Sequence, residues 1–179
     1  GGGDCWYWLY NGVIQSFGGD LIILSTEISK NILGIYYENG KSLTVDASIF
    51  DDNQIGYSSG ISVRGYTINP RVVIINSSFG KNSSVSLSGV SEFINSGNRI
   101  IPPNTSESIR LYDSIFSTDL VLNPGLTFLI GNVSVDRGKT LTINAGSIVK
   151  FQSYINGRYP RLLIRGTMQV KGDSDNKVY

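Results

Sequence analysis

The sequence predicts an all-β protein built as a solenoid, in which short strands stack in parallel from one coil to the next. Three observations support this prediction. A short pattern recurs three times, strand-like runs alternate with turn residues along the chain, and apolar residues never follow the 3.6-residue spacing of a helix. Gly, Asn, Ser and β-branched residues, which are poor helix formers, dominate throughout.

The recurring pattern is Val or Ile, two residues, Ser or Thr, one residue, Ile or Phe, two residues, and Asn. It covers Ile23–Asn31, Val45–Asn53 and Ile74–Asn82. A repeat of this length, roughly 20 to 50 residues, is one supersecondary unit that buries its apolar face only by stacking on its neighbours. We therefore expect one coil for each repeat, with strands added in parallel at about 4.8 Å per coil.

Equivalent positions of the repeat are expected to form rows along the solenoid. Ile28, Phe50 and Phe79 should form an interior row. Asn tolerates left-handed backbone geometry, and its amide can bond to the same amide in the next coil. We therefore interpret the asparagines that end the repeats as a structural ladder, made of Asn31, Asn53 and Asn82.

The individual strands are predicted from short apolar and β-branched runs that are bounded by turn residues such as Asn39-Gly40 and Asn123-Pro124-Gly125. In chain order these runs are Leu21–Leu24, Ile32–Tyr37, Leu43–Val45, Ile61–Val63, Val72–Ile75, Val85–Leu87, Ile109–Tyr112, Leu120–Leu122, Thr127–Ile130, Leu141–Ile143, Ile148–Phe151, Leu162–Ile164 and Thr167–Val170.

The repeat is interrupted in the middle of the chain. We expect β-helical repeats with an aromatic N-terminal segment over residues 1–88, a linker-like junction over 89–108, and a second β-helical piece over 109–179 that ends in mid-rung. In the second piece, Ser114-Ile115-Phe116 repeats Ser48-Ile49-Phe50. The two pieces either stack on one axis or bend at the junction.

Two segments resemble known families. The rungs over about residues 19–88, followed by Gly-Ile at Gly34-Ile35 and Gly60-Ile61, are similar to those of right-handed parallel β-helix proteins, the pectate-lyase-like group. The run that begins at Leu141, with Gly146, Lys150 and Phe151, resembles segments of large secreted bacterial surface proteins of the adhesin type. These resemblances imply a right-handed parallel β-helix, at the cell surface or outside the cell.

Composition excludes several function classes. The chain has no histidine, which removes Ser-His-Asp and Cys-His catalysis, and Cys5 alone cannot build a disulfide framework or a thiolate metal site. A formal net charge of +1 gives no electrostatic basis for binding nucleic acid. No apolar run is long enough to span a membrane. Charged residues make up only 16% of the chain, and such an uncharged polar surface favours an extracellular location.

Carboxylates are the remaining candidates for catalysis, because β-helix enzymes that cleave polysaccharides use clustered Asp or Glu, or calcium with a basic residue. The best cluster is Asp51-Asp52, with Asp46 on the same rung and Arg64 as a basic partner. The alternative interpretation is a solvated turn. Asp173 and Asp175 resemble a calcium loop but lack its spaced Gly and terminal Glu. No cofactor or metal is predicted.

Aromatic residues offer another candidate surface. Trp6, Trp8, Tyr36 and Tyr37 could stack on sugars, or could cover the end of the solenoid and mediate assembly. Our leading hypothesis is a non-catalytic extracellular segment with a structural or adhesive role, which self-associates end to end or continues a longer β-helix. A polysaccharide lyase or hydrolase domain and a glycan-binding module are the alternatives.

Overall fold

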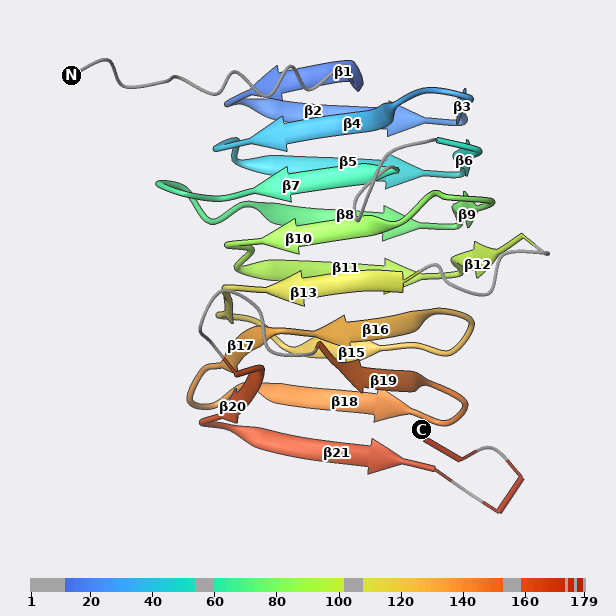
Figure 1. The fold of residues 1–179 in the computed structure, drawn as a ribbon. Helices are drawn as coiled ribbons and strands as arrows, with labels where there is room; N and C mark the ends of the chain where they lie inside the picture. The colour runs from blue at the N-terminus through green and yellow to red at the C-terminus, as the bar shows by residue number, and fades with distance from the viewer. Residues whose placement is uncertain are drawn as a thin grey trace.

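The computed structural model describes residues 12–53, 60–101, 108–152, 159–172, 174–175 and 177–178. Within these residues the chain forms 21 β-strands and no helix (Figure 1). Because no helix is present there, none is long and apolar enough to cross a membrane. The strands stack along one axis as a parallel β-solenoid, which confirms the predicted all-β solenoid.

One sheet, sheet A, runs the whole length of the solenoid. Each of its strands pairs in parallel with the sheet A strand of the next coil. We number the coils 1 to 7 by these strands, which are β1 (Gly12–Phe17), β4 (Leu33–Glu38), β7 (Ile61–Arg64), β10 (Val85–Ser88), β13 (Ser108–Tyr112), β16 (Thr127–Ile130) and β19 (Ile148–Phe151).

In coils 1 to 4 the chain passes from sheet A through a turn to a second long strand in sheet B. It then bends into a short corner strand in sheet C and returns to sheet A. Sheet B contains β2 (Asp20–Leu24), β5 (Ser42–Asp46), β8 (Arg71–Ile75) and β11 (Glu92–Ser96). Sheet C contains β3 (Glu27–Ser29), β6 (Ile49–Asp51), β9 (Ser78–Phe79) and β12 (Arg99–Ile100). We call these the A–B–C coils.

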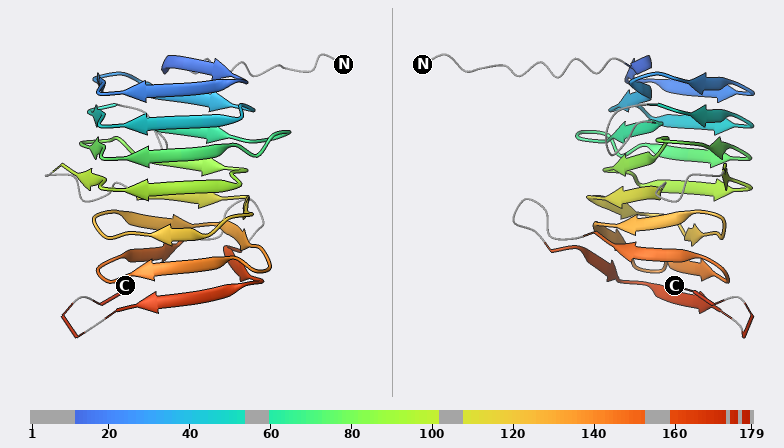
Figure 2. Two further views of the ribbon diagram at one scale, coloured as in Figure 1. Left: turned by 180° about the vertical axis from the view of Figure 1, so that it is seen from behind. Right: turned by 45° about the vertical axis from the view of Figure 1, so that its right-hand side comes forward.

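In coils 5 to 7 the corner strand comes before the second long strand instead of after it. The corner strands form sheet D, which contains β14 (Ser114–Phe116), β17 (Asn132–Val135) and β20 (Arg161–Ile164). The second long strands form sheet E, which contains β15 (Leu120–Leu122), β18 (Thr140–Asn144) and β21 (Thr167–Lys171). We call these the A–D–E coils. Sheets C and D therefore lie at opposite edges of the flattened stack, on the right and left of Figure 1 and visible again in Figure 2.

Hydrogen bonds join the two kinds of coil. The Asn95 side-chain amide donates to the carbonyl of Val121 at 2.7 Å, and that of Asn123 donates to the carbonyl of Asn95 at 2.6 Å, so β15 lies against β11. The backbone N–H of Ser117 donates to the carbonyl of Ser91 at 3.0 Å, which places the end of β14 beside the turn between β10 and β11. Because sheet A also continues without a break, both sets of coils share one axis.

The interval 89–108, which the sequence analysis expects to be a junction, contains β11 and β12. These strands pair in register with β8 and β9. Gly89 and Gly97 give this interval a linker-like composition, yet their positive φ angles of 66° and 65° mark sharp bends inside a regular coil. The change of coil type falls between β12 and β14.

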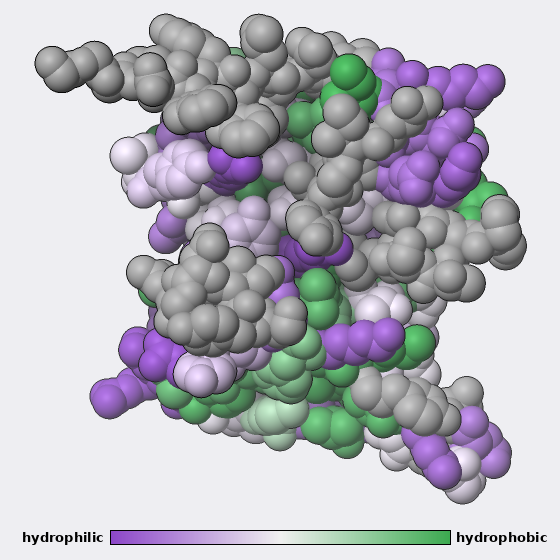
Figure 3. Space-filling view, viewed as in Figure 1, coloured by the Kyte–Doolittle hydropathy of each residue, from purple (hydrophilic) through white to green (hydrophobic). Residues whose placement is uncertain are grey.

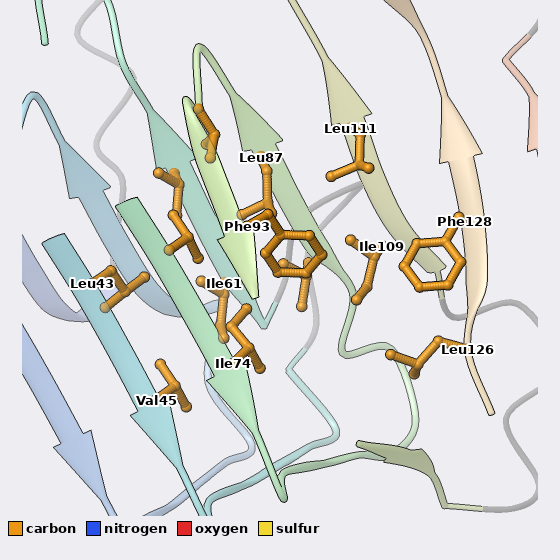
Figure 4. Packing of buried hydrophobic residues seen from close by; sticks show 14 of the residues in the cluster. Leu43, Val45, Ile61, Ile74, Leu87, Phe93, Ile109, Leu111, Leu126 and Phe128 are labelled. Atoms are coloured by element: carbon orange, nitrogen blue, oxygen red, sulfur yellow. The ribbon is translucent and has the colours of Figure 1, made fainter. Parts of the chain in front are cut away.

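The core is a set of apolar columns between the sheets. Alternate side chains along each strand point inward, and parallel pairing places each of them directly on its equivalent in the next coil. Leu43 stacks on Val72, and Val45 on Ile74, with all four side chains fully buried. Figure 4 shows these columns continuing towards Phe128 in coil 6.

Candidate functional site

The Ser and Thr positions of the repeat form the first polar column, at the bend between sheets B and C. The backbone N–H of Thr26 donates to the Ser48 hydroxyl at 3.2 Å, and that of Ser48 donates to the Ser77 hydroxyl at 3.2 Å. In the next coil the backbone N–H of Ser77 donates to the Asn98 side-chain oxygen at 2.9 Å. Each of these N–H groups therefore has its hydrogen-bond acceptor, a side-chain oxygen, in the following coil.

The same side chains also stabilise the bend within their own coil. The hydroxyls of Thr26, Ser48 and Ser77 each donate at 2.8 Å to the carbonyl two residues earlier. This contact fits the local geometry, because the residue before each of them has a left-handed backbone. The φ angles are 47° at Ser25, 49° at Ala47 and 51° at Asn76. The hydroxyl position of the repeat thus closes the bend and bonds adjacent coils.

The Asn position of the repeat forms a second polar column, with Asn53 at its centre. Asn53 is fully buried, and its side-chain oxygen accepts from the backbone N–H of Asn31 at 3.2 Å. Its amide nitrogen donates to the carbonyl of Ile28 and to the Ser83 hydroxyl, each at 3.0 Å. The column therefore runs through Asn31, Asn53 and Ser83.

Asn82, which the sequence analysis assigns to this column, occupies a different place. It is exposed, and its φ of 58° matches 59° at Lys30 and 49° at Asp52, the residues that precede Asn31 and Asn53. Coil 3 has one additional residue before the column position, so Ser83 takes that position. Asn suits both a left-handed backbone and an amide ladder, which is why the sequence pattern does not separate the two roles.

The apolar row of the repeat lies in the corner next to these columns. Ile28 pairs with Phe50, which pairs with Phe79, and all three side chains are buried. The two phenylalanine rings stack with their centroids 5.4 Å apart and their planes at 10°. An amide-to-amide contact of the kind expected for the repeat occurs in the A–D–E coils, where Asn144 donates to the Asn123 side-chain oxygen at 2.8 Å.

The candidate catalytic residues contact different neighbours, although Asp46, Asp51 and Asp52 all belong to coil 2. Asp46, at the end of β5, accepts from the Asn76 amide at 3.0 Å, and Asp52 forms an ion pair with Lys81 at 3.5 Å. Arg64 is on sheet A, with its guanidinium 5.7 Å from the centre of the Tyr36 ring. These charges therefore face different neighbours.

Asp51 is on β6, against Gly80 of coil 3. A Cβ atom at Gly80 would lie 2.1 Å from the Asp51 carboxylate, so the two chains approach closely there. Among the described residues, no group of three Asp, Glu, Cys or His side chains is placed to hold a metal ion. Asp175 is exposed, whereas Asp173 lies outside the described residues.

The candidate sugar-binding tyrosines are buried. The hydroxyl of Tyr37 lies 2.7 Å from the carbonyl oxygens of both Gly19 and Ser42. Burial, with a smaller contribution from the negative charge of Asp20, raises the pKa of Tyr37 above its usual value. Tyr37 therefore closes the turn between sheets A and B.

Tyr36 points to the outer side of sheet A, but its side chain is only 3% exposed. Its hydroxyl donates to the Glu38 carboxylate, and its ring contacts that of Phe17 with centroids 5.8 Å apart. Neither tyrosine presents an open ring face to solvent. Cys5, Trp6 and Trp8 lie outside the described residues.

The last coil exposes positions that are core elsewhere. Phe151, Met168 and Val170 are 55%, 47% and 55% exposed, although each occupies the inward register of its strand. Their partners one coil earlier, Ile130, Leu141 and Ile143, are buried. Figure 3 shows hydrophobic surface gathered at this lower, C-terminal end of the molecule. The sequence predicts that the second β-helical piece ends in mid-rung but does not single out these residues, because inward positions look the same in every coil.

Comparison with known proteins gives no relative. No protein-family model matches the chain, and no match is found among curated proteins or solved structures.

Proposed function

We propose that this chain is a non-catalytic, extracellular β-solenoid segment with a structural or adhesive role in a surface protein or filament. The observation that carries this proposal is the use of the repeat's polar side chains. The column from Thr26 to Asn98 and the buried Asn53 bond successive coils to each other. Side chains that are committed to such contacts stabilise a scaffold and are not free to bind a substrate.

The separate contacts of the candidate charges support a scaffold over a polysaccharide-cleaving enzyme. Cleavage of a glycosidic bond by paired carboxylates needs two carboxyl groups on either side of the same bond. Asp46 and Asp52 each contact a different neighbour, and Arg64 lies on another sheet. The burial of Tyr36 and Tyr37 likewise gives no support to a glycan platform at these residues.

The low charge content supports the extracellular part of the proposal, together with the resemblance to secreted surface proteins. The test is protease treatment of intact source cells, followed by mass spectrometry of the released peptides. Peptides from this segment should appear before lysis, with a cytosolic protein as the negative control. Release of these peptides only after lysis would contradict an extracellular location.

The non-catalytic part is tested by incubating the purified chain with a panel of polysaccharides, with and without calcium, and measuring new reducing ends or unsaturated products. We expect no product. Product formation that is abolished by Asp51→Asn or Asp52→Asn would overturn the proposal in favour of an enzyme. A Lys150→Gln variant, on the outer side of sheet A in coil 7, is the matched control for a change of surface charge.

A further inference from the structure

Sheets B and E form one continuous side of the solenoid. The side-chain amide of Asn123, just after β15, donates to the carbonyl of Asn95 in β11 at 2.6 Å, so sheet E continues where sheet B ends. The strands of this side all run in the same direction across the stack, as the view from behind shows (Figure 2). Every second residue of each strand points away from the core. In coils 1 to 6 the central outward residues form what we call the outer stripe, which consists of Ile22, Thr44, Val73, Ile94, Val121 and Thr142.

The outer stripe contains only apolar and hydroxyl side chains, and several of its residues are open to solvent. Ile22 is 63% exposed and Ile94 is 38% exposed, and Leu24 beside the stripe is 58% exposed. An uncharged, largely apolar row on a flat sheet has the composition of an interface centre, where charged side chains are depleted. The charged residues of these strands lie at the strand ends, and they are Asp20, Asp46, Arg71, Glu92 and Lys171.

Charge is segregated along the solenoid axis, although the formal net charge of the whole chain is only +1. The described residues of coils 1 and 2 carry six carboxylates and two cationic side chains, Lys30 and Lys41. The described residues of coils 6 and 7 carry seven cationic side chains and two carboxylates, Asp136 and Asp175. Two copies that lie side by side therefore attract each other when their axes run in opposite directions, and repel each other when the axes run in the same direction.

We propose that the side formed by sheets B and E binds a second copy of the chain, in an antiparallel pair whose two-fold axis runs along the strands and passes close to Ile94. The pair places the acidic coils of each copy against the basic coils of the other. It goes beyond the proposed scaffold role, and it depends neither on the location of the chain nor on the absence of catalysis. Because a two-fold axis uses the same surface on both copies, this surface must complement itself.

The outer stripe complements itself about this axis. Ile94 of one copy faces Ile94 of the other, and Val73 faces Val121 of the second copy, so apolar side chains meet at the centre of the contact. One coil further out, Thr44 faces Thr142 of the second copy, and their hydroxyls are able to bond to each other. The stripe therefore pairs like with like when the two axes are antiparallel.

The charged residues of this side fit the same arrangement. Since the axis runs along the strands, the strand ends of one copy meet the strand ends of the other. Asp46, at the end of β5 in coil 2, then lies beside coils 6 and 7 of the second copy, at the edge where Lys171 ends β21. Glu92 approaches its own equivalent across the axis, but Arg71 neutralises it within the chain, with the guanidinium nitrogen 3.1 Å from the carboxylate.

The area of this side is close to the lower limit for a specific dimer. Seven coils and strands of five residues give a side of about 34 Å by about 17 Å, or roughly 1,100 Å² for the two copies together. Specific interfaces begin at about 1,000 Å². We therefore expect a reversible dimer with a micromolar Kd.

Sedimentation equilibrium of the complete chain over a range of concentrations tests the pairing. Ile94→Lys places two like charges opposite each other on the axis and should weaken self-association by roughly tenfold or more. Ile49→Lys is the matched control, because Ile49 is 40% exposed but lies on the corner strand β6 of sheet C. Circular dichroism checks that both variants are folded. A parent chain that stays monomeric at the highest concentration measured, or equal association of the two variants, would overturn the proposal.

Crosslinking with a short thiol-reactive bifunctional reagent, in a Cys5→Ser background, tests the orientation. Ile22 in coil 1 and Gln169 in coil 7 are six coils, or about 29 Å, apart within one chain, but face each other in the antiparallel pair. A mixture of the Ile22→Cys and Gln169→Cys variants should therefore form a crosslinked dimer. Neither variant alone should do so. Crosslinking of the Ile22→Cys variant to itself would show parallel axes and contradict the proposal.

Charge reversal tests the electrostatic part of the proposal. Lys171→Glu should weaken the dimer severalfold at low salt, and this loss should shrink as salt screens the charges. Lys150→Glu makes the same change of net charge in the same coil, but on the outer side of sheet A, across the solenoid from the contact. It should leave the dimer close to the parent. Equal losses for the two variants, or a dimer that strengthens with salt, would contradict the predicted charge pairing.

Discussion

The backbone N–H of Ser48 donates to the hydroxyl of Ser77, which lies 3.2 Å away in the following coil. Both residues are buried, so water cannot replace the missing partner if this contact is lost. The Ser77 hydroxyl in turn donates to the carbonyl of Ile75 at 2.8 Å. The Ser77 hydroxyl thus forms one hydrogen bond within its own coil and a second one to the preceding coil.

Ser77→Ala should therefore destabilise the solenoid. The substitution leaves the buried N–H of Ser48 without an acceptor, which costs about 1–3 kcal/mol of unfolding free energy. Urea denaturation followed by circular dichroism measures the loss. Ser96→Ala is the control, because Ser96 is exposed at the end of β11, the strand that pairs with β8 just before the Ser77 bend. Equal stability of the two variants would contradict the role of the Ser77 hydroxyl.

The two asparagines of the repeat that differ in burial should respond differently to substitution. Asn53→Ala removes the partners of the Asn31 N–H and the Ile28 carbonyl, at about 1–3 kcal/mol for each group left unpaired. Asn82→Gly should be nearly neutral, because Asn82 is exposed and Gly adopts its φ of 58° without strain. Thermal melting of both variants distinguishes the buried column position from the exposed bend position. A larger decrease in melting temperature for Asn82→Gly than for Asn53→Ala would contradict our placement of the column.

The stacked rings of Phe50 and Phe79 should be energetically coupled. Phe50→Ala removes a fully buried ring and should cost about 3–5 kcal/mol. In a double-mutant cycle with Phe50→Leu and Phe79→Leu, we expect a coupling of about 0.5–1.5 kcal/mol from the aromatic contact. The matched cycle pairs Phe50→Leu with Phe128→Leu, because Phe128 is buried in the distant coil 6. Strictly additive losses for Phe50 and Phe79 would exclude the coupling.

The buried hydroxyl of Tyr37 should make stability depend on pH in the alkaline range. The pKa of Tyr37 is higher in the folded chain than in the unfolded chain, where it is about 10. Below that pH the hydroxyl is neutral in both states, and its full contribution to stability is present. Above that pH the unfolded chain loses the proton first, and stability falls as pH rises towards the folded-state pKa. Tyr37→Phe should remove this part of the decline in urea titrations.

Tyr66→Phe is the control for this pH dependence, because Tyr66 is 64% exposed. It should leave the alkaline decline of the parent chain in place. A decline that is unchanged in Tyr37→Phe would assign the pH dependence to other groups.

The sequence predicted most of the long strands, because a run such as Leu43–Val45 carries its apolar alternation locally. The corner strands β3, β6, β9, β12 and β14 are only two or three residues long, too short to show a period. β11 was missed for a different reason. Gly89, Gly97 and Asn98 around it have the composition of a linker, although they form bends and a hydrogen bond to Ser77.

The candidate site was less predictable than the fold. The pattern placed Asp46 and Asp52 near each other in the sequence, but their contacts with Asn76 and Lys81 depend on side chains one coil away. The burial of Tyr36 also depends on what surrounds it in space. A single sequence contains no record of these long-range neighbours.

The sequence by itself determined that the chain forms parallel coils, because the repeat requires equivalent side chains to stack on one another. Only the tertiary structure decided that Ser83 replaces Asn82 in the polar column, and that the corner strand changes sides between coils 4 and 5. The physical reason is that the alternation of apolar and polar residues along a strand involves only residues that are neighbours in the sequence. The side of the coil that holds a bend depends on the coils above and below it.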